Sequence, residues 1–210
     1  MTKTAAPMTS GSIWKQMTFF AMPIFLGNLF QQLYNTVDSL IVGNFLGSSA
    51  LAAVSSSGSL IFMLIGFLSG ISAGAGVIVA RFFGAGDEKN LQRAVHTTVA
   101  FGLVAGVLMT GVGVALSPQI LRWMDTPESV MRESVTYLQI YFAGSLGFVM
   151  YNVLVGILQA VGDSRHPLYY LIVSSVINLV LDLLFITGFH TGVGGAAVAT
   201  VISQIVSALL

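Results

Sequence analysis

Residues 33–42 read LYNTVDSLIV and place Asp38 inside a much longer apolar run that extends over residues 17–45. The whole chain is 55% hydrophobic and 8% charged, with a mean hydropathy of +0.89. Soluble domains carry about 25% charged residues. We therefore interpret the chain as a membrane protein, in which an ionised carboxylate at Asp38 is costly and requires a reason.

Six segments meet or approach the roughly 20 apolar residues that a helix needs to cross the hydrocarbon core. They are residues 17–45, 51–80, 94–116, 134–158, 168–188 and 194–210. The predicted fold is an all-α membrane protein, a bundle of six transmembrane helices over residues 17–210. Residues 1–16 are polar and are predicted to form a cytoplasmic stub. Because the last segment is still apolar at Leu210, we expect these residues to be part of a longer protein.

Lysine and arginine predict the orientation, because they gather on the cytoplasmic side of membrane proteins. With the N-terminus inside, six basic residues lie inside and Arg122 and Arg132 lie outside. The inside set is Lys3, Lys15, Arg81, Lys89, Arg93 and Arg165. The total charge balances, with 8 basic and 8 acidic residues, so no basic surface predicts nucleic-acid binding.

Two predicted helices carry glycines at four-residue spacing. Gly66, Gly70 and Gly74 repeat in the second segment, and Gly102 and Gly106 in the third. Small residues at this spacing let helix backbones approach closely in lipid. We predict that both stripes are packing faces.

Of the eight acidic residues, only Asp38 and Asp182 lie within apolar segments, where an ionised carboxylate costs about 2.5–3.5 kcal/mol. Counting from the segment ends places both acids in the outer half of the membrane, level with Thr200. Asn178 stands four residues before Asp182 on the same helix face. Tyr34 and Asn35 stand in the same relation to Asp38, and Tyr137 enters the same layer from the fourth segment.

Carboxylates, an amide and a hydroxyl provide the oxygen ligands that a hard monovalent cation prefers. Two carboxylates in a low dielectric also form a proton site, because burial and like charge favour the protonated form of one of them. A third interpretation is structural, with each acid capping a local hydrogen-bond network. No Lys or Arg in the predicted segments neutralises either acid.

Four stretches in order, YNTVDSLIVGNFLGSSALAAV, ISAGAGVIVARFFGAGDEKN, LQAVGDSRHPL and INLVLDLLF, resemble the multidrug and toxic compound extrusion (MATE) transporters over essentially the whole chain. The resemblance implies twelve helices in two lobes, of which this chain would be the N-terminal one, with the second lobe as its partner. It also implies a transporter in the cytoplasmic membrane, among lipid, that exports cationic and amphipathic drugs in exchange for Na+ or H+, with no other cofactor.

Carried over residue by residue, the resemblance implies a cation site formed by Asp38, Asn178, Asp182 and Thr200. Pro23 matches a proline at which the first helix of the family bends, whereas Leu183 stands where many members have a proline. Two alternatives remain. One is a flippase for lipid-linked saccharides, although no predicted span carries the positive charge that a pyrophosphate needs. The other is an intramembrane aspartyl protease, although neither acid follows a Gly-x-Gly motif.

Overall fold

The computed structural model describes residues 12–210, and these residues form helices joined by short turns. Most of the predicted stub, including Lys3, lies outside the described residues, and the first helix already begins at Ile13, before the predicted boundary at residue 16. The elements are α1 (Ile13–Leu46), α2 (Ser48–Gly84), α3 (Glu88–Trp123), α4 (Glu128–Ala143), α5 (Ser145–Ala160), α6 (Arg165–Leu183), the π-helical η1 (Leu184–Gly188) and α7 (Gly192–Leu209).

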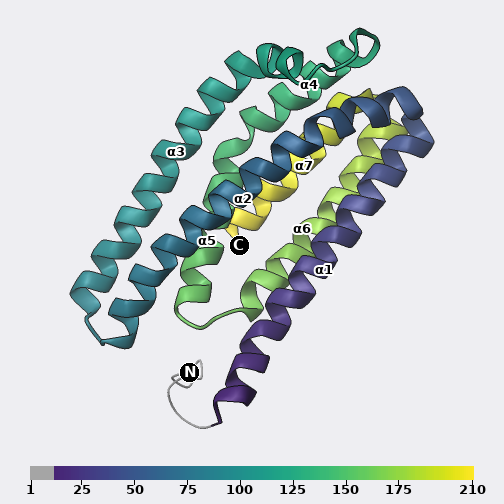
Figure 1. The fold of residues 1–210 in the computed structure, drawn as a ribbon. Coiled ribbons are helices and arrows are strands. Elements are labelled where there is room, and N and C mark those ends of the chain that lie inside the picture. The colour runs from purple at the N-terminus through teal and green to yellow at the C-terminus, as the bar shows by residue number, and fades with distance from the viewer. Residues whose placement is uncertain (1–11) are drawn as a thin grey trace.

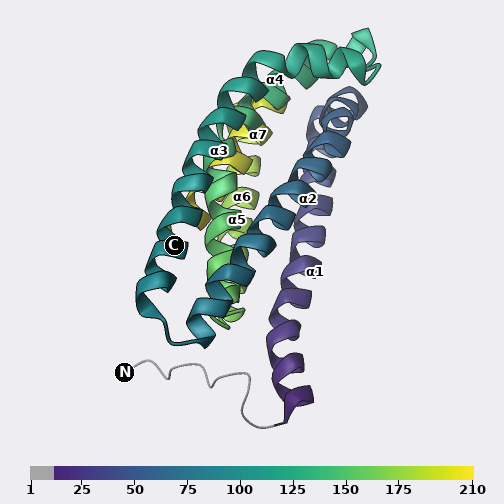
Figure 2. The same cartoon turned by 60° about the vertical axis from the view of Figure 1, so that its left-hand side comes forward.

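The helices run up and down an elongated bundle (Figure 1). α1 packs along α6 and more briefly against α2, whereas α3 packs on α4 and α5 at the other side of the bundle. α7 lies between these two groups, against α4, α5 and α6. The turned view shows α1 and α3 on opposite sides, with α2 crossing between them (Figure 2). The chain makes the first return with a single residue, Gly47, whose positive φ of 89° suits glycine.

The described helices confirm the all-α membrane fold. α2, α3, α6 continued by η1, and α7 are each long and apolar enough to cross a membrane, and α4 with α5 makes a fifth, bent crossing. α1 has 34 residues but is less apolar, since its middle carries two glutamines, two asparagines and Asp38. Its interpretation as a crossing, predicted at residues 17–45, therefore rests on its length and on its position beside α6.

The third helix is longer than the predicted segment 94–116 and continues through Pro118 to Trp123. Proline has no N–H to donate to the carbonyl four residues earlier, which usually interrupts a helix. Here that carbonyl belongs to Val114, and it accepts a hydrogen bond from Gln139 Nε2 of α4 at 3.4 Å. Because a side chain from another helix replaces the missing donor, the helix continues where the sequence predicts a loop.

The fourth predicted segment, 134–158, is not one straight helix. It breaks at Gly144 into α4 and α5, which meet at an angle of 50°. A Cβ at Gly144 would overlap the side chain of Val201 in α7. Across the break, the hydroxyl groups of Ser145 and Thr110 of α3 are 2.9 Å apart and hydrogen-bonded. The bend therefore lies where α3, α5 and α7 converge.

The two glycine stripes behave differently. The prediction for α3 is correct, since a Cβ at Gly102 would approach Val153 to 2.9 Å and one at Gly106 would approach Leu146 to 2.7 Å. The prediction for α2 is wrong within the described residues, because a Cβ added at Gly66, Gly70 or Gly74 would have no neighbouring atom within 4 Å. The spacing alone does not identify which side of a helix has a neighbour.

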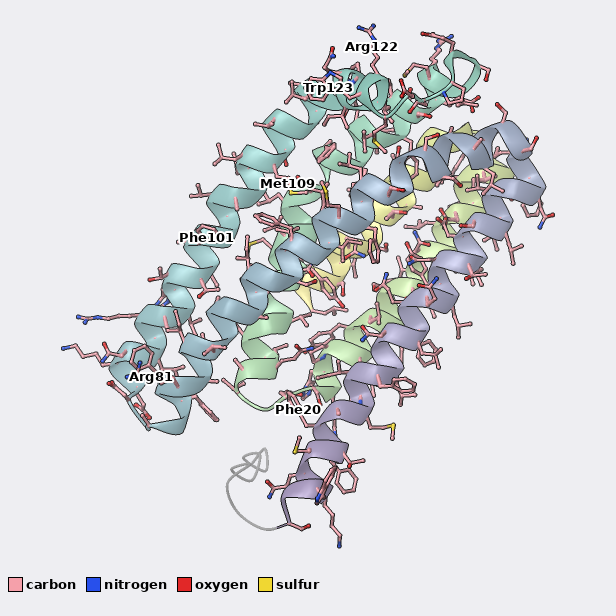
Figure 3. All side chains as sticks on the ribbon, viewed as in Figure 1. Phe20, Arg81, Phe101, Met109, Arg122 and Trp123 are labelled. Atoms are coloured by element: carbon pink, nitrogen blue, oxygen red, sulfur yellow. The ribbon has the colours of Figure 1, made fainter. Side chains whose placement is uncertain are left out.

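Charged and aromatic residues mark the two ends of the bundle (Figure 3). Arg81 lies at the end that holds the α2–α3 connection, and Arg122 and Trp123 lie at the opposite end. Trp123 is 71% exposed, and Trp14, near the start of α1, is 81% exposed. Tryptophans at both ends are typical of proteins that span the membrane, where these side chains lie at the lipid–water interfaces.

Candidate cation site

The acid pair, Asp38 and Asp182, is brought together by α1 and α6. Both helices run in the same direction side by side (Figure 1). Asp38 lies eight residues before the end of α1, and Asp182 is the second-last residue of α6. The two carboxyl groups lie within hydrogen-bonding reach of each other. Asp182 is fully buried and Asp38 is half-buried. The structure thus pairs two acids that are distant in sequence.

Asn178 connects Asp182 to α7. With its amide nitrogen toward the acid, Asn178 donates a hydrogen bond to Asp182 Oδ2 at 2.7 Å, and its amide oxygen accepts one from the Thr200 N–H at 3.1 Å. This orientation gives both ends of the amide a suitable partner, so the neighbours determine it. The prediction that Asn178 shares a helix face with Asp182 is therefore correct, and Thr200 lies beside them.

Two carboxylate oxygens of the site have no partner. Asp38 Oδ1 and Asp182 Oδ1 are buried and accept no hydrogen bond from the described residues. An unpaired buried polar atom costs about 1–3 kcal/mol, and more when it carries charge. A proton between the carboxyl groups, or a cation bound to both, would remove this cost. The donor set of carboxylate, amide and hydroxyl groups suits either.

The three other residues predicted in this layer, Tyr34, Asn35 and Tyr137, fall into two groups. Tyr34 is half-buried, and its hydroxyl is within hydrogen-bonding reach of Thr200. Tyr137 is buried in α4 and packs in the cluster that covers the site. Asn35 instead lies on the exposed side of α1, about 100° around the helix from Tyr34. The structure does not bring Asn35 to the acid pair.

Tyr141 is a neighbour that the sequence interpretation missed. It is buried, and its ring stacks on that of Tyr137 with the centroids 6.5 Å apart. The sequence could have indicated it, because Tyr141 stands one helical turn after Tyr137 on the same face of α4.

Pro23, predicted to bend the first helix, lies inside an uninterrupted α1 and is half-buried.

An apolar layer covers the site on the side of the α1–α2 and α6–α7 connections. Each polar residue has a buried residue one turn nearer that end: Val42 after Asp38, Ile186 after Asp182 and Ala196 before Thr200. These three belong to one core cluster, which also contains Tyr137. We call Val42, Ile186 and Ala196 the covering layer. It separates the acid pair from the nearer end of the bundle.

Directly beyond Asp182, α6 changes into the π-helix η1. Leu183, which stands where many members of the resembling family have a proline, is the last α-helical residue. Its carbonyl accepts a hydrogen bond from the Thr187 hydroxyl at 2.5 Å, and the Phe189 N–H bonds to the Leu184 carbonyl, five residues back, at 3.0 Å. The helix therefore widens at the level of the covering layer.

The profile of the MatE family matches residues 23–184, which include three of the four predicted cation-site residues. The chain belongs to the MatE family. It is therefore a multi-pass membrane protein of this family, as the resemblance predicted, and the family assignment favours transport over the protease alternative.

Two further comparisons agree with the assignment. The chain is 38% identical over 203 residues to the probable multidrug resistance protein YoeA of Bacillus subtilis (strain 168), covering 95% of this chain and 44% of that protein. It is also similar to crystal structures of MATE in the bent and straight conformations, with TM-scores of 0.88 and 0.87, 29% identity, and coverage of 95% of this chain and 44% of those chains. The MatE chain thus spans about half the length of the curated relatives it matches.

Proposed function

We propose that this MatE chain forms the cation-binding lobe of a drug exporter, which exchanges Na+ or H+ for cationic and amphipathic compounds across the cytoplasmic membrane. The observation that carries the proposal is the acid pair between α1 and α6. Asp38 and Asp182 each leave one buried oxygen without a partner among residues 12–210. A cation or proton that binds reversibly between the two carboxyl groups would give these oxygens a partner.

Coupling requires that the cation and the drug favour different conformations, because a ligand shifts an equilibrium only by its differential affinity. The covering layer gives this coupling a physical basis. Val42, Ile186 and Ala196 are all at most 2% exposed, so they separate the acid pair from one end of the bundle. Opening this layer would hydrate the carboxyl groups and release the cation at that end.

The orientation is part of the proposal. With the N-terminus in the cytoplasm, the covering layer faces outside and the α2–α3 connection, with Arg81 and Lys89, faces inside. A second lobe would supply the other wall of the drug pathway, and the drug would be displaced outward after the cation binds.

The test is drug export by the full-length protein in cells, driven by a Na+ gradient or by a pH gradient. Asp38→Asn and Asp182→Asn should each abolish export while the protein is still produced and inserted. Asp125→Asn is the matched control, because Asp125 is an exposed acid in the α3–α4 connection. Normal export by both site variants would rule out the cation site, and dependence on only one gradient would identify the coupling ion.

A further inference from the structure

A hollow of about 330 Å3 lies between α2, α3 and α5, on helix faces away from the acid pair. It is open on one side, and its lining is mostly apolar. The residues that matter here are Ile71, Gly74, Ala75, Thr97, Phe101 and Val153. A Cβ added at Gly74 would have no atom within 4 Å, so the hollow is not filled by the described residues.

Basic side chains continue along the same helix faces that line the hollow. Lys89, Arg93, Thr97 and Phe101 follow one another at four-residue spacing on α3, so they form one stripe. Arg81 stands seven residues after Gly74, which is two turns along the same face of α2. Figure 3 shows Arg81 near the α2–α3 connection and Phe101 farther along α3. All three basic residues are exposed.

The two acids of this connection lie off the basic stripe, although Asp87 offsets part of the charge of Arg93. The Asp87 carboxylate caps α3, accepting hydrogen bonds from the Asn90 side chain at 2.7 Å and from the Asn90 N–H at 3.1 Å. These hydrogen bonds, with the nearby charge of Arg93, lower the pKa of Asp87. Glu88 points about 100° around α3 from Lys89. The faces next to the hollow therefore carry Arg81, Lys89 and Arg93 without an acid on the same stripe.

The depth of these groups matches the dimensions of one lipid leaflet. At 1.5 Å per residue, Arg81 and Arg93 lie about 5 and 8 Å from the ends of their helices at the α2–α3 connection. Thr97 and Phe101 lie about 14 and 20 Å from that end. Half of the hydrocarbon core is about 15 Å thick. The basic residues are thus at headgroup level and the hollow is at the level of the acyl chains.

We propose that the hollow binds an anionic phospholipid, with one acyl chain between α2 and α3 and the phosphate held by Arg81, Lys89 and Arg93. The hollow gives the chain an apolar, unfilled space, and the basic stripe gives the headgroup complementary charge. Each basic residue near a membrane surface favours anionic lipid by about fivefold. The site is independent of the acid pair, so its test does not depend on transport.

The experiment uses the full-length protein with its tryptophans, including Trp14 and Trp123, replaced by phenylalanine, and a single reporter, Phe101→Trp. The protein is placed in phosphatidylcholine vesicles that contain either phosphatidylglycerol or phosphatidylcholine with brominated acyl chains. Brominated phosphatidylglycerol should quench the reporter at about fivefold or more lower mole fraction. Arg93→Gln or Lys89→Gln should each reduce this preference about fivefold, whereas Arg122→Gln at the other end of α3 should leave it unchanged.

Val107→Trp is the matched reporter, because Val107 is exposed on α3 but does not line the hollow. It should be quenched equally by the two lipids. Native mass spectrometry of the unaltered protein and of Arg93→Gln gives a second measurement, in which the variant should retain less phosphatidylglycerol. Equal quenching of the Phe101→Trp reporter by both lipids, or a preference that survives the Arg93 and Lys89 substitutions, would overturn the proposal. So would an absence of quenching, since another part of the protein would then cover the hollow.

Discussion

Asp38 of α1 and Asp182 of α6 place their carboxyl groups within hydrogen-bonding reach of each other, and neither forms an ion pair with a described residue. Asn178 fixes Asp182 to α7 through Thr200. Three helices therefore meet at one polar point. Binding or release of a cation or proton at this point therefore changes the contacts of α1, α6 and α7 together.

Replacing Asn178 by leucine should weaken cation dependence. The substitution removes the donor to Asp182 Oδ2 and leaves a further carboxylate oxygen unpaired, at a cost of about 1–3 kcal/mol. We expect the cation or proton concentration for half-maximal export to change about tenfold or more.

Ser175→Ala is the control for Asn178→Leu. Its hydroxyl lies on the same helix but donates only to the Leu171 carbonyl, at 2.8 Å. An Asn178→Leu variant with an unaltered cation dependence would show that the amide has no part in the site.

Gly144→Ala should destabilise the protein, because the new methyl group would overlap Val201. Overpacking of this kind costs about 1–3 kcal/mol. Thermal unfolding of the purified protein in detergent measures the loss, and Val201→Ala in the same protein should restore most of it. Gly66→Ala is the control, since the described residues leave open space there. Equal effects at Gly144 and Gly66 would contradict the close approach of α5 and α7.

Asp163→Asn should lower stability at neutral pH but not in acid. Partial burial alone would raise the pKa of Asp163, but hydrogen bonds from the His166 backbone and side chain and from the Arg165 backbone outweigh it, so the pKa is lowered. A lowered pKa means that the stabilisation is fully present above the unfolded value of about 3.9 and is lost as the pH falls through the folded value. The carboxylate lies at the N-terminus of α6, where its negative charge, which asparagine lacks, contributes about 0.3–1 kcal/mol.

Unfolding of wild type and Asp163→Asn, followed from pH 7 to pH 3, tests this. The difference between the two melting temperatures should begin to shrink as the pH falls below about 4, the ordinary pKa of aspartate, and should vanish below the lowered pKa of the folded state. A difference that does not shrink at all between pH 5 and pH 3 would mean that Asp163 stabilises α6 without its charge.

Pro23→Ala should slow export without weakening the fold. Alanine restores the missing N–H and removes a helix cost of about 3 kcal/mol, so α1 should become stiffer and at least as stable. If bending of α1 is a step of transport, the export rate should fall severalfold while the cation dependence is retained. Pro118→Ala in α3 is the control, because the carbonyl that Pro118 leaves without a helix donor, that of Val114, already accepts a hydrogen bond from Gln139. Equal loss of export in both variants would argue against a special role of Pro23.

Much of the site was predictable from residue type and depth. Few acids lie in apolar segments, and counting from the segment ends placed Asp38, Asp182 and Thr200 in one layer with Asn178 a turn away. Helical periodicity is enough for such residues, because their spacing along one helix fixes the face they share. Tyr141 could have been found in the same way from Tyr137.

The features that the sequence did not predict depend on contacts between helices. Helix α3 continues through Pro118 because Gln139 of α4 supplies a donor. The α4–α5 bend occurs at Gly144, and not at another glycine, where Val201 of α7 leaves no room for a side chain. The glycine stripe of α2 lacks a neighbour among the described residues for the same kind of reason. Local composition cannot identify which partner stands opposite a given face.

The π-helix beyond Asp182 makes the geometry of the site sensitive to chain length. A π turn holds about one residue more than an α turn. Deleting one residue within Leu184–Gly188 would therefore be absorbed as an ordinary α turn, whereas deleting two would turn everything after it by about 100° about the helix axis. Thr200 would then leave Asn178 although no residue of the site had changed. A polar cluster shared by α6 and α7 thus depends on the number of residues between them as much as on their identity.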